Sequence, residues 1–161
     1  MSKVFHDSLG HVVPYEENLP ITWRLTVYAF AVRDGKILML QPCGSERWEL
    51  PGGEVHPHET LLEGLIRECW EETGYQFVPQ DILPIHFTEQ FFYERELSKY
   101  RHAVIVVFAG TITSSGDPDW TNAEANEVKR VEWISPHQLN ASNTHPNQLP
   151  ALIKSGLVTL R

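Results

Sequence analysis

The 161-residue chain has little of what marks several large classes of protein. Its two cysteines, Cys43 and Cys69, are too few for a disulfide framework and are not spaced as a CxxC metal pair. No apolar run is long enough to cross a membrane, and the N-terminal residues contain no apolar signal segment. These absences argue against a disulfide-rich secreted scaffold and a helical membrane protein, and they predict a cytoplasmic location.

Positive charge is also scarce. Thirteen Lys and Arg residues stand against 21 Asp and Glu residues, and the formal net charge is −8. No run of basic residues resembles the footprint of a protein that binds duplex nucleic acid, so we expect neither duplex nucleic acid nor a membrane as a partner. An anionic small molecule is still compatible with this composition, provided that positive charge is supplied locally, most simply by a bound metal ion.

The length fits one domain over residues 1–161, in which residues 1–20 are expected to form an N-terminal extension packed on the rest. Asp34-Gly35 predicts a tight hairpin turn between strands near 23–33 and 36–41. Further strands are expected at 47–50, 76–78, 83–93, 101–113 and 128–134, with short strands possible around residues 4–5 and 12–13. We expect a polar loop over 114–126, a helix start at Ser135 and a last helix over about 146–155.

A central helix is the best-defined element. Thr60 and Glu63 have the spacing of a capping box, and Gly74 stands where a glycine commonly ends a helix. The predicted helix therefore runs from Leu61 to Thr73. Its apolar stripe is expected to consist of Leu62, Leu65, Ile66 and Cys69.

Three carboxylates of this helix share one side. At about 100° per residue, Glu68, Glu71 and Glu72 occupy an arc of roughly 100° that borders the apolar stripe. Like charges at this spacing repel, and a hard divalent cation with oxygen ligands would relieve the repulsion. Gly64, one turn earlier, leaves space beside the carboxylates for a loop or a ligand.

The segment from Gly53 to Tyr75 resembles the signature of the Nudix hydrolases, G-x5-E-x7-R-E-U-x-E-E-x-G-U, where U is bulky and apolar. The matching residues are Gly53, Glu59, Arg67, Glu68, Glu71, Glu72 and Gly74. Cys69, smaller than usual, and Tyr75, an aromatic variant, occupy the U positions. The flanking WELPGG and EVKRVEWISPHQL segments are similar to those that border the signature in many members, so the resemblance covers roughly residues 22–140.

This resemblance implies an α/β fold, an α/β/α sandwich around a mixed β-sheet in which the signature forms a loop–helix–loop motif. It also implies hydrolysis of a nucleoside diphosphate linked to another moiety, with Mg²⁺ or Mn²⁺ as cofactor. Glu71 and Glu72 would be metal ligands together with the Gly53 carbonyl, and Glu68 would be a ligand or the base. Arg67 and Glu59 would orient this cluster.

Many members take a further acidic ligand or base from a later loop. Glu127 is the preferred candidate for that catalytic and metal-binding role, and the rivals are Glu89, Glu94 and Glu124.

Residues outside the signature set the substrate, and the sequence identifies them less well. Arg24 and Arg47 are candidates to contact phosphate, and Trp48 and Tyr93 are candidates to stack on a base. Core packing or an ordinary salt bridge remains open for each of them. His56 and His58, in the signature loop, would either meet phosphate or stay exposed.

We expect a nucleotide as the small-molecule substrate, with a (d)NTP pyrophosphohydrolase as the first hypothesis. Hydrolysis of ADP-ribose, a nucleotide sugar or a dinucleoside polyphosphate is the alternative. A nucleotide-binding regulator without turnover is the alternative outside the enzymes. Isomerase chemistry on isoprenoid diphosphates is disfavoured, because the signature is intact and a matching second motif is missing. A homodimer remains open.

Overall fold

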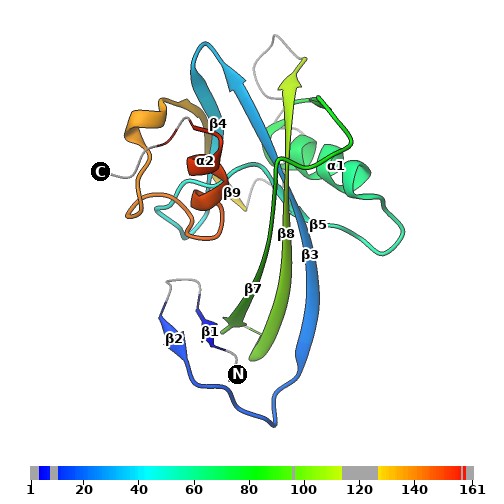
Figure 1. Cartoon of the computed structure of the whole chain (residues 1–161), viewed down its shortest axis with the longest axis vertical. Coiled ribbons are helices and arrows are strands. Elements are labelled where there is room, and N and C mark those ends of the chain that lie inside the picture. The colour runs from blue at the N-terminus through cyan, green and yellow to red at the C-terminus, as the bar shows by residue number, and fades with distance from the viewer. Residues whose placement is uncertain (1–3, 8–10, 96, 114–126, 157, 159–161) are drawn as a thin grey trace.

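The computed structural model describes residues 4–7, 11–95, 97–113, 127–156 and 158 (Figure 1). Within these residues the elements are β1 (Phe5–His6), β2 (Val12–Val13), β3 (Ile21–Arg33), β4 (Lys36–Pro42), β5 (Gly52–Glu54), α1 (Leu61–Thr73), β6 (Phe77–Pro79), β7 (His86–Glu94), β8 (Lys99–Ile112), β9 (Val128–Ile134), the 3₁₀ helix η1 (Pro136–Gln138) and α2 (Leu149–Lys154).

The strands form one mixed sheet in the order β2-β1-β7-β8-β3-β4-β9, with β5 paired to β3 and β6 paired to β8. At its centre the long strands β3 and β8 run parallel, from Ile21 opposite Tyr100 to Ala31 opposite Gly110. Strand β7 pairs antiparallel with β8, and β4 pairs antiparallel with β9. In Figure 1 the lower parts of β3, β8 and β7 extend well beyond both helices.

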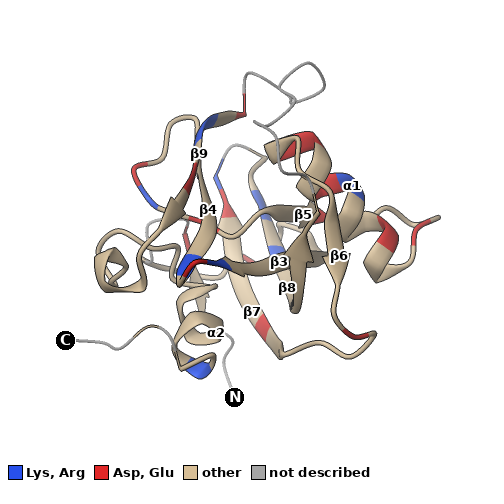
Figure 2. Ribbon diagram, turned by 90° about the horizontal axis from the view of Figure 1, so that it is seen from above, with Lys and Arg blue, Asp and Glu red and all other residues tan. Residues whose placement is uncertain are grey.

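Alternate residues of β3 bury against different helices, because successive side chains of a strand point to opposite faces. Val27 and Ala29 pack in one core cluster with Leu65 and Cys69 of α1. Phe30 packs in a second cluster with residues of α2. The two helices therefore lie on opposite faces of the sheet (Figure 2), which confirms the predicted α/β/α arrangement.

Helix α1 has the predicted bounds and caps. The Thr60 side chain accepts from the Glu63 backbone N–H, while the Glu63 side chain accepts from the Thr60 backbone N–H, so that both halves of the capping box are present. Gly74 adopts the left-handed conformation with φ 66° and donates its N–H to the Trp70 carbonyl. Local sequence signals thus define both ends of the helix that carries the acidic residues.

The predicted apolar stripe is wrong at Ile66, which is 40% exposed. Gly64 is buried instead, on the other side of Glu68. A Cβ at Gly64 would lie 3.2 Å from Glu59 Oε2 and 3.3 Å from Val55 Cγ2, so the signature loop fills the space beside this glycine. The loop extends the buried side of α1 toward the carboxylates and leaves Ile66 at the solvent edge.

Other expectations differ in detail. Residues 47–50 form only isolated bridges, Leu40 with Glu49 and Trp48 with Thr144, rather than a strand. Residues Gly52–Glu54, for which no strand was predicted, form β5 because they pair with β3. Helix α2 is shorter than predicted and begins at Leu149, with Pro150 in its first turn. The loop expected over 114–126 lies outside the described residues.

Among the described residues, no helix combines the length and the apolar character that crossing a bilayer requires.

Candidate active site

Strand β5 brings two glycines against the acidic side of α1. A Cβ at Gly53 would lie 2.6 Å from the carboxyl carbon of Glu68. The Gly52 N–H donates to Glu72 Oε2 at 2.7 Å. Gly52 itself has φ 141°, and a Cβ there would lie 2.0 Å from the Val27 carbonyl oxygen. Pairing with β3 requires glycine at position 52, whereas glycine at position 53 leaves room for the Glu68 carboxylate to approach the backbone.

Arg67 links the signature loop to the helix. Its Nε and Nη2 donate to the two carboxylate oxygens of Glu59 at 2.6 and 2.9 Å, and Nη2 also donates to the Glu54 carbonyl at 3.0 Å. Its Nη1 donates to Glu68 at 2.9 Å and to Glu71 at 2.8 Å. One guanidinium therefore fixes three carboxylates relative to one another, and it is 24% exposed.

The carboxylates have unequal electrostatic environments. Burial raises the pKa of Glu72 well above its ordinary value, and the charges of Glu68, Glu49 and Glu127 raise it further. Burial also raises the pKa of Glu68, although Arg67 opposes this effect. In contrast, hydrogen bonds from Arg67 lower the pKa of Glu59 to about 2. The site thus combines an ionised Glu59, which is paired with Arg67, with buried carboxyl groups whose negative charge is poorly compensated.

Two hollows that share lining residues border this site. The smaller, of about 230 Å³, is lined by His56, Arg67, Glu68, Glu71, Glu72, Glu127 and Val128. The larger, of about 1060 Å³, includes Glu68, Glu72 and Glu127 and continues along β3, β7 and β8. Glu127, just before β9 in the chain, is therefore brought to the α1 carboxylates, together with the backbone of Gly53.

Of the four candidate substrate-binding residues outside the signature, two line the large cleft and two do not. Arg24 lines the large cleft, with its Nε 3.3 Å from Glu54 Oε2, and Tyr93 also lines it. Trp48 is only 8% exposed within the α2 core cluster, with the Arg130 guanidinium 4.6 Å from its ring centroid. Arg47 donates to the Thr144 carbonyl at 3.5 Å. Neither Trp48 nor Arg47 is among the described residues that line the two hollows.

The rivals of Glu127 have different surroundings. Glu89 lies 3.0 Å from the ring of His102, and Glu94 lies 2.7 Å from Arg101. Both belong to β7 and line the large cleft, but not the smaller hollow with the α1 carboxylates. Glu124 lies outside the described residues.

Three cleft residues were not singled out by the sequence. Burial raises the pKa of Glu49 to about 7 and that of Tyr28 to about 12. Burial also lowers the pKa of His145 to about 4. Glu49 belongs to the WELPGG segment, which was a usable signal. Tyr28 reaches the site because it pairs with Gly52, a register that only the folded sheet reveals.

The donor set fits a hard divalent cation. Glu68, Glu71 and Glu72 offer only oxygen atoms, which Mg²⁺ and similar ions prefer. The Glu72 carboxylate accepts from Gly52, while the Arg67 hydrogen bonds go to other carboxylates. A buried carboxylate of this kind is strongly disfavoured as an anion unless a positive charge lies beside it. A bound cation would supply that charge.

Comparison with known proteins agrees with this geometry. A family model for the NUDIX domain matches residues 22–154, which include the whole of α1, β5 and Glu127.

The chain belongs to the Nudix family.

The CTP pyrophosphohydrolase of Escherichia coli (strain K12) is 31% identical over 134 residues, covering 78% of this chain and 86% of its own length. The MutT-like protein of Streptomyces ambofaciens is 28% identical over 128 residues, covering 79% and 73%. The crystal structure of a MutT NUDIX hydrolase from Burkholderia pseudomallei matches with a TM-score of 0.63 at 24% identity, covering 83% of this chain and 98% of that one. This Nudix protein is therefore a pyrophosphohydrolase, of a family that generally uses divalent metal ions and acts on small nucleotides.

Proposed function

We propose that this Nudix enzyme is a Mg²⁺-dependent (d)NTP pyrophosphohydrolase, which cleaves the triphosphate to a nucleoside monophosphate and pyrophosphate. One observation carries the proposal. Glu68 and Glu72 line the wall of one cleft of about 1060 Å³ together with Gly53 and Glu127. Burial in this wall is unfavourable for unpaired anions and favourable for a metal-bound site.

Each residue then has a distinct task. Glu68, Glu71 and Glu72 would hold Mg²⁺ with the Gly53 carbonyl, and Mn²⁺ could substitute for it. When bound, the ion neutralises charge on phosphate oxygens and makes water more acidic. Glu127, exposed beside the α1 carboxylates, would take the proton from the attacking water. Arg67 and Glu59 keep the carboxylates in position.

The substrate preference rests on the cleft and on one relative. Arg24 is the cation of the cleft wall next to β5, where its ion pair with Glu54 can be exchanged for a substrate phosphate. The Escherichia coli relative, which is matched over 78% of this chain and 86% of its own length, is named a CTP pyrophosphohydrolase, and this name supports a nucleoside triphosphate as the first substrate class to test.

The length of the cleft supports a second candidate, a dinucleoside polyphosphate or another extended nucleotide. Tyr93 pairs with Tyr100, which pairs with Ile21, whereas Gly53 pairs with Val27. Along β3, Ile21 and Val27 are six residues apart, which corresponds to roughly 20 Å between the Tyr93 end and the Gly53 end of the cleft. Tyr93 would therefore contact only the distal part of a long substrate, and ADP-ribose and nucleotide sugars belong to the same test.

The proposal is tested by assaying the purified protein with Mg²⁺ on dNTPs, NTPs, ADP-ribose, nucleotide sugars and dinucleoside polyphosphates, with products separated by chromatography. We expect nucleoside triphosphates to be cleaved fastest and EDTA to abolish turnover. Glu72→Gln should lower kcat by roughly 100-fold or more, because it removes charge from the metal site. Glu63→Gln is the matched control, since Gln preserves the capping box on the same helix.

An absence of hydrolysis on every substrate, combined with unchanged metal affinity in Glu72→Gln, would refute the enzymatic proposal and favour a nucleotide-binding regulator. Faster cleavage of an extended nucleotide would replace the first substrate class with the second.

A further inference from the structure

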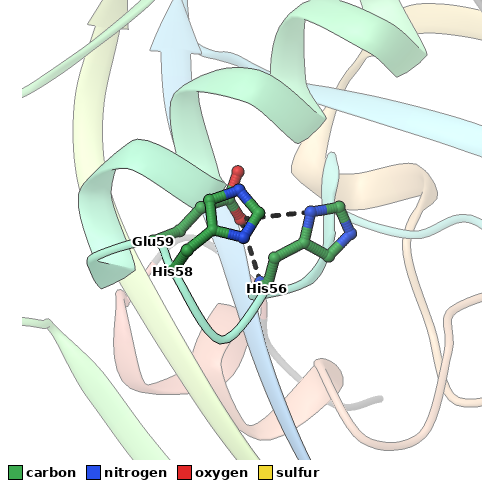
Figure 3. Close-up of side chains that lie close together, drawn as sticks. All are labelled: His56, His58 and Glu59. Carbon is green, nitrogen blue, oxygen red and sulfur yellow. Dashed lines mark hydrogen bonds and ion pairs between the residues drawn. The ribbon is translucent and has the colours of Figure 1, made fainter.

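The signature loop carries a cluster of possible metal ligands separate from the α1 carboxylates. His56, His58 and Glu59 each offer one ligand atom, and these atoms lie within 4.8 Å of one another. Figure 3 shows the two imidazole rings and the carboxylate converging on one side of the loop. The ring centroids of the two histidines are 5.7 Å apart, and His56 Nδ1 is 3.8 Å from Glu59 Oε2.

Backbone contacts fix the geometry of this loop. The His56 N–H donates to Glu59 Oε2 at 2.9 Å, and the Glu59 N–H donates to the His56 carbonyl at 3.0 Å. Arg67 holds the same carboxylate from the helix side. Both histidines are exposed, so their rings can turn toward an ion while the loop backbone stays in place.

We propose that His56, His58 and Glu59 form a second metal site, which binds an imidazole-preferring divalent ion such as Zn²⁺. Imidazole nitrogen and carboxylate oxygen bind Zn²⁺ at about 2.0–2.2 Å, and water completes a three-residue site. The ligand atoms have to approach one another by roughly 1 Å to reach tetrahedral separations. Mg²⁺ prefers oxygen ligands and would select the α1 carboxylates instead.

The loop site and the α1 carboxylates share the ion pair between Arg67 and Glu59. An ion on Glu59 competes with Arg67 for the carboxylate and places a second positive charge beside the guanidinium. Arg67 also holds Glu68 and Glu71, so a weaker contact with Glu59 loosens both of these residues. His56 also borders the smaller hollow. We therefore expect Zn²⁺ bound to the loop to reduce hydrolysis. This inhibition rests on the proposed function, whereas the binding of Zn²⁺ does not.

The experiment measures Zn²⁺ binding to the whole protein by titration calorimetry, with millimolar Mg²⁺ present to occupy the α1 carboxylates. We expect one Zn²⁺ ion to bind with micromolar affinity. His58→Gln should weaken this binding roughly tenfold or more, because it removes one of three protein ligands. His137→Gln, which changes an exposed histidine on η1, is the matched control and should bind like the wild type.

Two further measurements locate the ion. Glu72→Gln should retain the Zn²⁺ site, and Zn²⁺ should inhibit the wild type more strongly than His58→Gln at saturating Mg²⁺. The proposal is overturned if His58→Gln binds Zn²⁺ as the wild type does, or if Glu72→Gln alone loses the binding, since the ion would then lie on the α1 carboxylates. Because the calorimetric result does not require turnover, it stands even if the protein hydrolyses none of the nucleotides.

Discussion

At the scale of single residues, the site combines one carboxylate held as an anion with another whose charge is disfavoured. Glu59 accepts two hydrogen bonds from Arg67 and one from the His56 backbone. Glu72 is buried near other carboxylates and accepts one from the Gly52 backbone. Arg67 accounts for part of this difference, because it donates to Glu59, and its Nη1 hydrogen bonds go to Glu68 and Glu71.

The Glu59–Arg67 contact predicts a particular pH dependence of stability. The pKa of Glu59 is about 2 in the folded protein, against about 4.3 in an unfolded chain. Its stabilising contribution is therefore complete above about pH 4.3 and is lost as the pH falls toward 2. Glu59→Gln should lower the urea midpoint at neutral pH, and this difference from the wild type should shrink between about pH 5 and pH 3.

Glu46→Gln is the control for this measurement, because the exposed pair of Glu46 with Lys129 should contribute little. A difference between wild type and Glu59→Gln that stays constant over the acid range would show that the variant acts through packing rather than through ionisation.

At the scale of elements, the function of β5 is to bring backbone against the acidic side of α1. Gly53→Ala would place a methyl group 2.6 Å from the Glu68 carboxyl carbon. We expect the Glu68 side chain to move, because it is flexible, and Mg²⁺ affinity and kcat to fall by roughly 10–100-fold. The free energy of unfolding should fall by only about 1–3 kcal/mol. Metal titration, steady-state kinetics and urea unfolding measure the three effects.

Gly52→Ala provides the contrast. Its Cβ would meet the Val27 carbonyl rather than a movable side chain, and its φ is 141°. This variant should lose stability together with activity. If Gly53→Ala retained normal metal affinity and kcat, the position assigned to Glu68 at the metal site would be wrong.

The sequence predicted elements well where the signals are local. The capping box and Gly74 give both ends of α1, and Asp34-Gly35 gives the β3–β4 turn. The prediction is wrong at Ile66 because the signature loop packs against Gly64 on the other side of the helix. It is incomplete at β5 because this strand forms only by pairing with the distant strand β3. No periodicity within α1 or within the loop contains that information.

At the scale of the whole molecule, the cleft is assembled from segments that are far apart in the chain. Tyr28, Glu49 and His145 come from three such segments, and they line the cleft with residues of the N-terminal part. Arg24 was identifiable only by its charge and Tyr93 only by its aromatic side chain, whereas the equally plausible Trp48 packs in the core. Side-chain type therefore suggested candidates, but the pairing of β3 with β8 and β5 decided which of them reach the cleft.

The N-terminal hairpin closes the outer part of the cleft. Phe5 is fully buried, with ring centroids of Tyr100 at 4.3 Å and Phe91 at 5.6 Å. Strand β1 pairs with β7 at His6 and Phe92, and the buried Asp7 carboxylate accepts from Arg95 at 2.9 Å. The neighbouring Val4, His6 and Asp7 line the cleft. The hairpin is therefore a wall of the cleft, held by the buried Phe5 ring together with the Asp7–Arg95 ion pair.

Phe5→Ala should loosen this wall without disturbing the α1 carboxylates. Truncating a buried Phe costs about 3–5 kcal/mol, which is enough to raise the open fraction of a terminal segment while the Asp7–Arg95 pair remains. The affinity for substrate falls by the fraction of molecules that remain closed, so KM should rise while kcat and Mg²⁺ affinity stay near the wild type. Val12→Ala, at a position that is 67% exposed on the same hairpin, should leave KM unchanged. Steady-state kinetics on the preferred nucleotide measure the effect, and an equal loss of kcat and Mg²⁺ affinity would instead show that the hairpin supports the whole fold.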